Sequence, residues 1–175
     1  VGSGAVSAPF TATEDSDCAI VIGARPTTNH PVAATYIKQA AKKGTKVIIM
    51  DPRKNDMSRH AWEHLEFKPG MDVAMLNALI YTIIEEELYD KQYVQSMTNG
   101  FEELKKSIEG FSPEEMSKKC GIDASTLRKV ARVYANSERS IIFWGMGISQ
   151  HVHGTDNARC LITLSLITGQ IGRPG

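Results

Sequence analysis

The stretch that decides the fold is CAIVIGARPTTNHP, residues 18–31. Its first five residues form a short apolar run rich in β-branched side chains, which predicts a central parallel strand covered on both faces. Gly23 follows this run, and glycine lets the backbone approach a ligand closely. Pro31 suits the first turn of a helix, which Asn29 or His30 is placed to cap. A helix N-terminus at the carboxyl end of a parallel strand is a common anion site.

A β-α-β unit continues from this stretch. Apolar residues spaced for one helical face run from Ala33 to Ala41, and Gly44 suits the left-handed residue beyond a helix end. Lys46–Met50 predicts a second buried strand, and Asp51 follows it, where nucleotide-binding folds hold ribose hydroxyls. Because the GxGxxG fingerprint is absent, the sequence predicts a Rossmann-like fold without an ordinary NAD site.

The later segments complete a predicted three-layer α/β/α domain with a mostly parallel sheet. A short strand within residues 63–67 and a turn at Lys68–Met71 precede a long helix that Asp72 is expected to cap. Residues from about 88 to 137 are typical of a helical insertion, which we expect to cover an edge of the sheet. Ser140–Trp144 predicts another strand, from which Gly145–Gly147 turns into an apolar helix.

Length and composition exclude several classes of protein. The chain has 175 residues, enough for one domain with one core, and its formal net charge of zero gives no argument for binding nucleic acid or a membrane surface. The hydrophobic content of 42% is typical of a globular protein, and no apolar run is long enough to span a bilayer. The cysteines, which form no CxxC pair, are predicted to be buried free thiols and fit a reducing, cytoplasmic compartment: Cys18, Cys120 and Cys160.

Polar residues follow three of the predicted strands, and the carboxyl ends of parallel strands meet at one edge of a sheet. Asp51 can accept hydrogen bonds from ribose hydroxyls, and Arg53 can stack on a base or pair with a phosphate, although Asp-Pro-Arg is also favourable in a turn. The carboxylate of Asp72 can accept two hydrogen bonds from guanine, which adenine cannot match; a plain helix cap explains the same residue.

Other chemistry is not indicated by the sequence. His151 and His153 could bind a metal as an HxH pair, but no third ligand is near, so we expect a solvated loop and no metal site. His60 and His64 are interpreted as surface or packing residues. No nucleophile–base pair and no carboxylate pair has catalytic spacing, so no catalytic residue is expected in this chain; a bound cofactor would then carry the chemistry.

Five motifs of the chain resemble those of molybdopterin oxidoreductases and follow in the same order. The segment Glu85–Asp90 is most similar to the catalytic (alpha) subunit of formate dehydrogenase, and nitrate reductase is the nearest rival within this superfamily. The five motifs are Gly23–Pro31, Asp51–Arg53, Lys68–Asp72, Trp144–Gly147 and Thr168–Pro174.

The resemblance implies a cofactor and a parent enzyme. Members of this superfamily bind two molybdopterin guanine dinucleotides around one molybdenum or tungsten, and the parent would oxidise formate to CO2 and pass electrons to a 4Fe-4S cluster. Residues 1–175 would be a single dinucleotide-binding domain of a larger multidomain subunit, inactive in isolation. Its partners would be the remaining domains and electron-transfer subunits. The metal ligand, the substrate-binding arginine and the cluster cysteines would lie outside this chain.

The strand ends and the resemblance together give a set of expected cofactor-binding residues. The family often has Asn where Arg25 stands, and this arginine adds positive charge beside a diphosphate. The full set is Gly23, Arg25, Thr28, Asn29, His30, Asp51, Arg53, Lys68, Gly70, Asp72, Gly145, Met146, Gly147 and Gln150. The alternative from another class is a stand-alone, non-catalytic Rossmann-like module that binds a common nucleotide.

Overall fold

A sheet of four parallel strands forms the centre of the molecule. The computed structural model describes residues 8–172. The strands lie in the order β3-β2-β1-β4. The central strand β1 pairs along its whole length with β2 and β4, and all five of its residues are buried. The predicted strands are therefore confirmed, and the sheet is parallel throughout: β1 (Cys18–Ile22), β2 (Lys46–Met50), β3 (Glu63–Leu65) and β4 (Ser140–Trp144).

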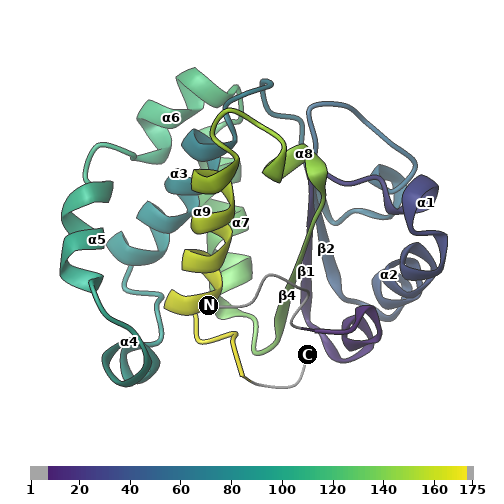
Figure 1. Ribbon diagram of the computed structural model, residues 1–175, viewed down its shortest axis with the longest axis horizontal. Helices are drawn as coiled ribbons and strands as arrows, with labels where there is room; N and C mark the ends of the chain where they lie inside the picture. The colour runs from purple at the N-terminus through teal and green to yellow at the C-terminus, as the bar shows by residue number, and fades with distance from the viewer. Residues whose placement is uncertain (1–7, 173–175) are drawn as a thin grey trace.

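One face of the sheet is covered by α2 (Pro31–Lys43), on the right in Figure 1. The helix buries Ala34, Ile37 and Ala40, which lie on one side of a helix with 3.6 residues per turn. It ends as predicted at Gly44, which adopts the left-handed conformation with φ of 111°. The short helices η1 (Phe10–Asp15) and α1 (Pro26–Asn29) contact α2.

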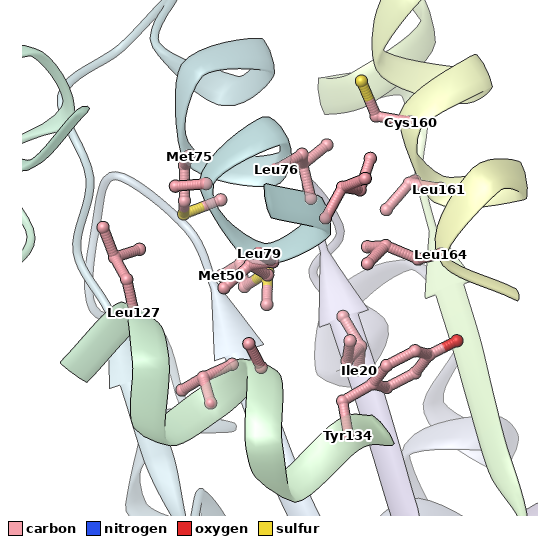
Figure 2. Close-up of a cluster of buried hydrophobic side chains, with 14 of the residues drawn as sticks. Ile20, Met50, Met75, Leu76, Leu79, Leu127, Tyr134, Cys160, Leu161 and Leu164 are labelled. Atoms are coloured by element: carbon pink, nitrogen blue, oxygen red, sulfur yellow. The ribbon is translucent and has the colours of Figure 1, made fainter. Parts of the chain in front are cut away.

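The opposite face carries the larger core, shown in Figure 2. Side chains of α3 (Asp72–Glu85), α7 (Ala124–Asn136) and α9 (Gly154–Ile167) converge there on β1 and β2. Leu76 and Leu79 of α3 lie above Ile20 of β1, and all three are at most 1% exposed. Burial of such side chains contributes roughly 2 kcal/mol each to folding, so this face contributes much of the stability of the domain.

Three further helices form an outer layer: α4 (Lys91–Met97), α5 (Phe101–Ile108) and α6 (Pro113–Cys120). The helices α5 and α6 contact α3, and α4 contacts α9 (Figure 1). The expectation that the whole insertion covers a sheet edge is wrong: its outer helices pack on α3 and α9, and α7 belongs to the core of one face. Two of these helices begin at local caps, because Asp90 accepts a hydrogen bond from the N–H of Tyr93, and Ser112 from that of Glu115.

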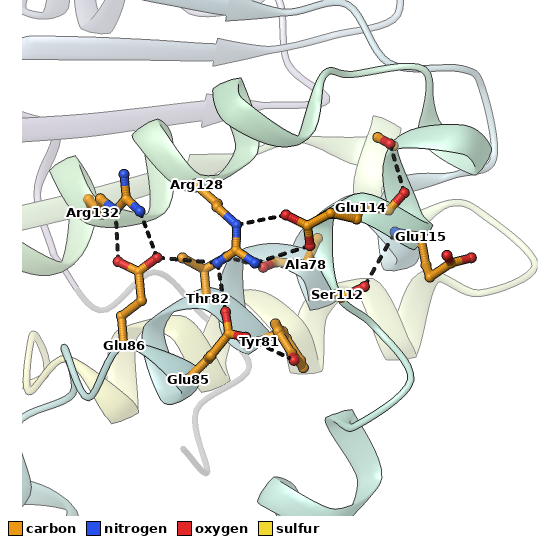
Figure 3. Close-up of polar contacts among 11 residues, drawn as sticks. Ala78, Tyr81, Thr82, Glu85, Glu86, Ser112, Glu114, Glu115, Arg128 and Arg132 are labelled. Carbon is orange, nitrogen blue, oxygen red and sulfur yellow. Dashed lines mark hydrogen bonds and ion pairs between the residues drawn. The ribbon is translucent and has the colours of Figure 1, made fainter.

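Charged side chains join α3, α6 and α7 outside the core (Figure 3). The guanidinium of Arg128 on α7 donates to Glu85 at 2.6 Å and to Glu114 at 3.0 Å, and it also contacts Glu86 at 3.2 Å. Arg132 pairs with Glu86 at 2.7 Å. Because one partly buried arginine is shared by acids from two helices, this cluster fixes how α3, α6 and α7 sit against each other.

The predicted cap of α3 needs correction, and three connecting segments contain short helices. The residue that caps α3 is Met71, and Asp72 is the first helical residue, because the helix begins one residue earlier than predicted. The segment after β1 contains α1, and the segment after β4 contains α8 (Met146–Ser149). A short 3-10 helix, η2 (Ser58–His60), precedes β3.

The cysteines are buried free thiols, as predicted. Burial raises the pKa of Cys18 to about 12 and that of Cys160 to about 11, so both stay protonated at neutral pH. Among residues 8–172, no helix combines the length and the apolar character needed to cross a membrane.

Candidate functional site

The segments that follow β1, β2 and β4 meet at one edge of the sheet, as the sequence predicts. Backbone hydrogen bonds continue past the strands: Gly23 N–H donates to the carbonyl of Met50 at 3.2 Å, and Gly145 N–H to that of Ile22 at 3.2 Å. This edge is the upper end of the sheet in Figure 1, where α8 follows β4. From β1 the chain adds β2 and β3 on one side of the sheet, and β4 then pairs with β1 on the other side. The place between β1 and β4 is therefore the topological switch point, where such sheets bind ligands.

Glycines let the two segments at the switch point touch. Gly23 has a φ of 56°, and a β-carbon placed on it would lie 2.8 Å from the backbone carbon of Gly147. The N–H of Gly147 donates to the carbonyl of Gly23 at 3.1 Å. A β-carbon on Gly145 would lie only 2.6 Å from that same carbonyl oxygen. Because these glycines carry no side chain, the backbone of the segment after β1 contacts the backbone of the segment after β4 directly.

The predicted diphosphate residues lie together in the segment after β1. Arg25 directly precedes α1, Thr28 and Asn29 belong to its last turn, and His30 ends it. His30 also immediately precedes α2, whose first residue is Pro31, as predicted. The four side chains are exposed at the edge of the sheet.

Asp51 and Arg53 form a tight turn after β2. One carboxylate oxygen of Asp51 accepts a hydrogen bond of 2.8 Å from the N–H of Arg53. The carbonyl of Asp51 contacts Nε2 of His64 at 3.2 Å. The turn thus holds Asp51 in place while the Arg53 side chain stays exposed.

Asp72 is a buried carboxyl group at the start of α3, with 3% of its surface exposed. Desolvation raises its pKa, and its own N–H and the nearby His151 act in the opposite direction. His151 lies in the segment between α8 and α9, so this segment contributes to the electrostatic surroundings of Asp72. A buried carboxylate with few donors of its own is suited to accept hydrogen bonds from a ligand.

Apolar side chains lie open to solvent on the segment after β4. Trp144 is 45% exposed, Met146 is 63% exposed, and Val152 is 98% exposed. Gln150 ends α8 and is also exposed. Because large apolar side chains are usually covered, this group marks a surface suited to contact with a ligand or another domain.

Lys68 and Gly70 lie in the predicted turn before α3. The side chain of Lys68 lies next to Gly121. A β-carbon on Gly121, just after α6, would lie 3.3 Å from Cε of Lys68. The Lys68 N–H donates to the carbonyl of Cys120 at 2.8 Å. Lys68 therefore joins the turn to α6, and Gly70 provides a positive φ of 80°.

Sequence reasoning missed Asn157, which fixes the segment after β4. Its side chain is 1% exposed, and its Nδ2 donates to the carbonyl of Ile148 in α8 at 3.1 Å. The signal was present, because Asn157 stands four residues before Leu161 on the buried side of α9. Thr27, Lys54 and Asn55 were missed too, since nothing in a polar loop marks them as neighbours of Arg25.

Among the hollows open to solvent on the described surface, two lie at opposite ends of the sheet. The smaller, of about 210 Å³, lies between α1 and the segment after β2. The larger, of about 670 Å³, adjoins the amino ends of β1, β2 and β4. It is lined by four acidic and three basic side chains, so neither sign of charge dominates: Glu14, Asp15, Asp17, Glu138, Lys43, Lys46 and Arg139.

The topology defines a Rossmann-like α/β domain, a class of fold that binds ligands at the carboxyl ends of its strands. The chain belongs to the molybdopterin oxidoreductase family, which it matches over residues 1–175.

Curated relatives refine this assignment. The chain is 41% identical over 174 residues to formate dehydrogenase H of Escherichia coli, covering 99% of this chain and 24% of that protein. It is 40% identical to the F420-dependent formate dehydrogenase subunit alpha of Methanocaldococcus jannaschii, over 99% of this chain and 26% of that one. A nitrate reductase of Synechocystis is 34% identical, over 93% of this chain and 23% of its own. The chain thus spans about a quarter of the length of these relatives.

A solved structure shows the same fold. Acetylene hydratase from Pelobacter acetylenicus superimposes with a TM-score of 0.85 at 26% identity, covering 93% of this chain and 24% of that one. The predicted membership of the superfamily, with formate dehydrogenases among the relatives, and the predicted fold class are both confirmed.

Proposed function

We propose that this chain is the domain that binds a molybdopterin guanine dinucleotide in the catalytic subunit of a formate dehydrogenase. The observation that carries the proposal is the direct backbone contact of Gly23 with Gly147, two residues without a side chain at the switch point of the sheet. Identities of 40% and 41% to formate dehydrogenases favour formate as the substrate of the parent enzyme. Because these relatives are about four times longer, we propose that further domains complete the enzyme.

The residues at the edge fit such a cofactor by their chemistry. Asp51 would accept hydrogen bonds from ribose hydroxyls, and the guanidinium of Arg53 would stack on the base or pair with a phosphate. Asp72 would accept hydrogen bonds from the N1 and N2 groups of guanine through its buried carboxylate. The segment after β4 would border the cofactor through Gly145, Met146, Gly147 and Gln150, and that after β1 through Arg25, Thr28, Asn29 and His30.

The reaction proposed for the parent converts formate to CO2, a proton and two electrons. When bound, the molybdopterin would supply the redox chemistry through its molybdenum or tungsten, and a 4Fe-4S cluster outside this chain would receive the electrons. The residues of this chain bind and orient the dinucleotide. We therefore expect the isolated 175-residue chain to be inactive on formate.

The experiment replaces one carboxylate in the intact protein. Asp72→Asn keeps the size of the side chain but exchanges an acceptor for an amide donor that faces the donors of guanine. We expect at least a tenfold loss of bound cofactor, measured as GMP released by acid hydrolysis, because a hydrogen bond to a charged group contributes about 1.5–3 kcal/mol. Formate-dependent reduction of a viologen dye should fall in proportion.

The matched control is Asp156→Asn, the same chemical change at an exposed position in the first turn of α9. It should leave both the GMP content and the activity unchanged. Unchanged GMP content in Asp72→Asn would remove the role assigned to Asp72, and a wild-type protein without GMP would refute the proposed cofactor.

Nitrate reduction is a second candidate activity, because a nitrate reductase is 34% identical to this chain. The same purified protein can be assayed with nitrate and reduced viologen. Turnover of nitrate without turnover of formate would select this alternative. A non-catalytic nucleotide-binding module predicts neither activity, and calorimetry with GDP against ADP would then show whether guanine is preferred.

A further inference from the structure

We propose that Asn157 of α9 is a positioning residue for the cofactor, because it holds α8 in the place where the backbone after β4 borders the dinucleotide. This inference rests on the proposed function. Asn157 is 1% exposed, so it acts through α8 and not through a contact with the cofactor. It belongs neither to the motifs that carry the family resemblance nor to the expected cofactor-binding residues.

The amino end of α8 is tied to the segment after β1, because the N–H of Gly147 donates to the carbonyl of Gly23 at 3.1 Å. The helix has only four residues, and a helix of this length is not stable by itself. Its first side chain, Met146, is 63% exposed, so solvent borders one side of the helix. Contacts with neighbouring elements must therefore hold α8 in place.

The carboxyl end of α8 is tied to α9. The last carbonyl groups of a helix have no partner within the helix, and Ile148 is a fully buried residue. Asn157 supplies the missing donor, since its Nδ2 lies 3.1 Å from the carbonyl oxygen of Ile148. Close to this bond, a β-carbon on Gly154 would overlap the carbonyl oxygen of Ser149. The end of α8 therefore packs directly on the backbone of α9.

Packing alone does not explain an asparagine at this position. A carbonyl group only accepts hydrogen bonds, so Asn157 must present Nδ2 to Ile148, and its Oδ1 is then buried without a partner among the described residues. A buried acceptor without a partner is unfavourable, and an apolar side chain would avoid it. The bond to Ile148 accounts for the amide. The helix that carries it is a firm support, because Leu161 and Leu164 are buried in the core.

The test measures hydrogen exchange and GMP content in the intact protein. Asn157→Leu keeps the size and branching of the side chain but removes the donor. We expect residues 146–150 to exchange about tenfold faster, as the loss of one hydrogen bond predicts, and bound GMP to fall at least threefold. The control Val130→Ala removes buried methyl groups from the core on α7. It should speed exchange in β1 but leave residues 146–150 and GMP content unchanged.

Asn157→Asp provides a rescue that a loss of packing would not show. A neutral carboxyl group has the shape of the amide and donates through its O–H, whereas a carboxylate cannot donate. Burial raises the pKa of a carboxyl group, so exchange of residues 146–150 should match the wild type at about pH 5 and approach that of Asn157→Leu as the group ionises. Titratable side chains at this end of α9 are the same in variant and wild type, so the ratio of the two rates removes their contributions: Asp72, His151, His153, Asp156 and Arg159.

The proposal is overturned if Asn157→Leu leaves either the exchange of residues 146–150 or the GMP content at the wild-type level, or if Val130→Ala lowers GMP content as much. Exchange in Asn157→Asp as fast at about pH 5 as in Asn157→Leu would also overturn it, because the donor would then have no effect. A wild type without bound GMP would refute the proposed function, while the exchange rates would still show whether Asn157 holds α8.

Discussion

At the scale of single residues, Gly23 shows why the contact between the segments after β1 and β4 depends on glycine. It combines a positive φ with a backbone contact too close for any β-carbon, and each property alone disfavours a side chain. The neighbours are backbone atoms of Gly147 and Ile148, which cannot move aside as a flexible side chain could. The close contact therefore requires residues without a β-carbon, and Asp72 supplies a buried carboxyl group at the start of α3.

We expect Gly23→Ala to destabilise the intact protein by about 1–3 kcal/mol, because the added methyl group forces the segments after β1 and β4 apart. Thermal unfolding and GMP content measure the two effects. Gly110→Ala is the control, since a β-carbon there has no neighbour within 4 Å; it should change the free energy of unfolding by less than about 0.5 kcal/mol. Equal effects of the two substitutions would contradict the close contact.

At the scale of elements, Arg128 connects three helices that the chain supplies from distant segments. The acids that it binds lie at the end of α3 and the start of α6, and its own helix α7 packs against both. Its side chain is 21% exposed, so the surrounding protein partly shields these ion pairs from solvent. The pKa of Glu86 is lowered by its hydrogen bond to Arg132, with a contribution from Arg128.

Arg128→Met should lower the free energy of unfolding by about 1–2 kcal/mol at pH 7, as expected for a partly buried charge network. Because the pKa of Glu86 is lower in the folded state, the network stabilises above the ordinary value of 4.5 and is lost as pH falls through the folded value. The difference between mutant and wild type should therefore shrink below about pH 4.5, measured by urea unfolding at several pH values.

The control for this element is Lys118→Met, which removes an exposed pair with Glu115 within α6. Such a pair contributes about 0–0.5 kcal/mol, so its removal should be nearly neutral. A loss in Arg128→Met no larger than in Lys118→Met would show that the cluster does not hold the helices together.

At the scale of the whole molecule, the layers differ in how deeply they are buried. The strand β1 is enclosed by two neighbouring strands and by helices on both faces, whereas α4 contributes only Val94 to the core. The helices α4, α5 and α6 form an outer cover, in which α5 and α6 contact α3 and α4 contacts α9. Stability in such a layered domain is not uniform, because outer elements can open while the sheet stays intact.

Native-state hydrogen exchange should resolve these layers. We expect the amides of β1 to be the slowest to exchange and those of α4 and α5 to exchange through smaller opening reactions, because fewer apolar contacts hold them. Mass spectrometry of peptides under increasing urea measures the order. Equal opening free energies for β1 and α4 would mean that the domain unfolds as one unit.

The sequence determined the elements and the edge at which they end. The apolar runs of β1, β2 and β4, the caps Asp90 and Ser112, and Gly44 are local signals, since each depends on neighbours within a few residues. Parallel strands then require that Gly23, Asp51 and Gly145 share one edge. This is why so much of the fold could be predicted, although the cap of α3 and the place of the outer helices could not.

Only the tertiary structure decided which side chains meet. Asn55 joins Arg25 in one pocket, His151 approaches Asp72, and Arg128 reaches acids 14 and 42 or more residues away. Lys68, by contrast, turns toward Gly121. Such pairs depend on how helices and loops pack across the sheet, and the polar pattern of a loop carries no signal of that distance. Local chemistry thus specified the strands and their shared edge, while packing specified the surroundings of each polar group.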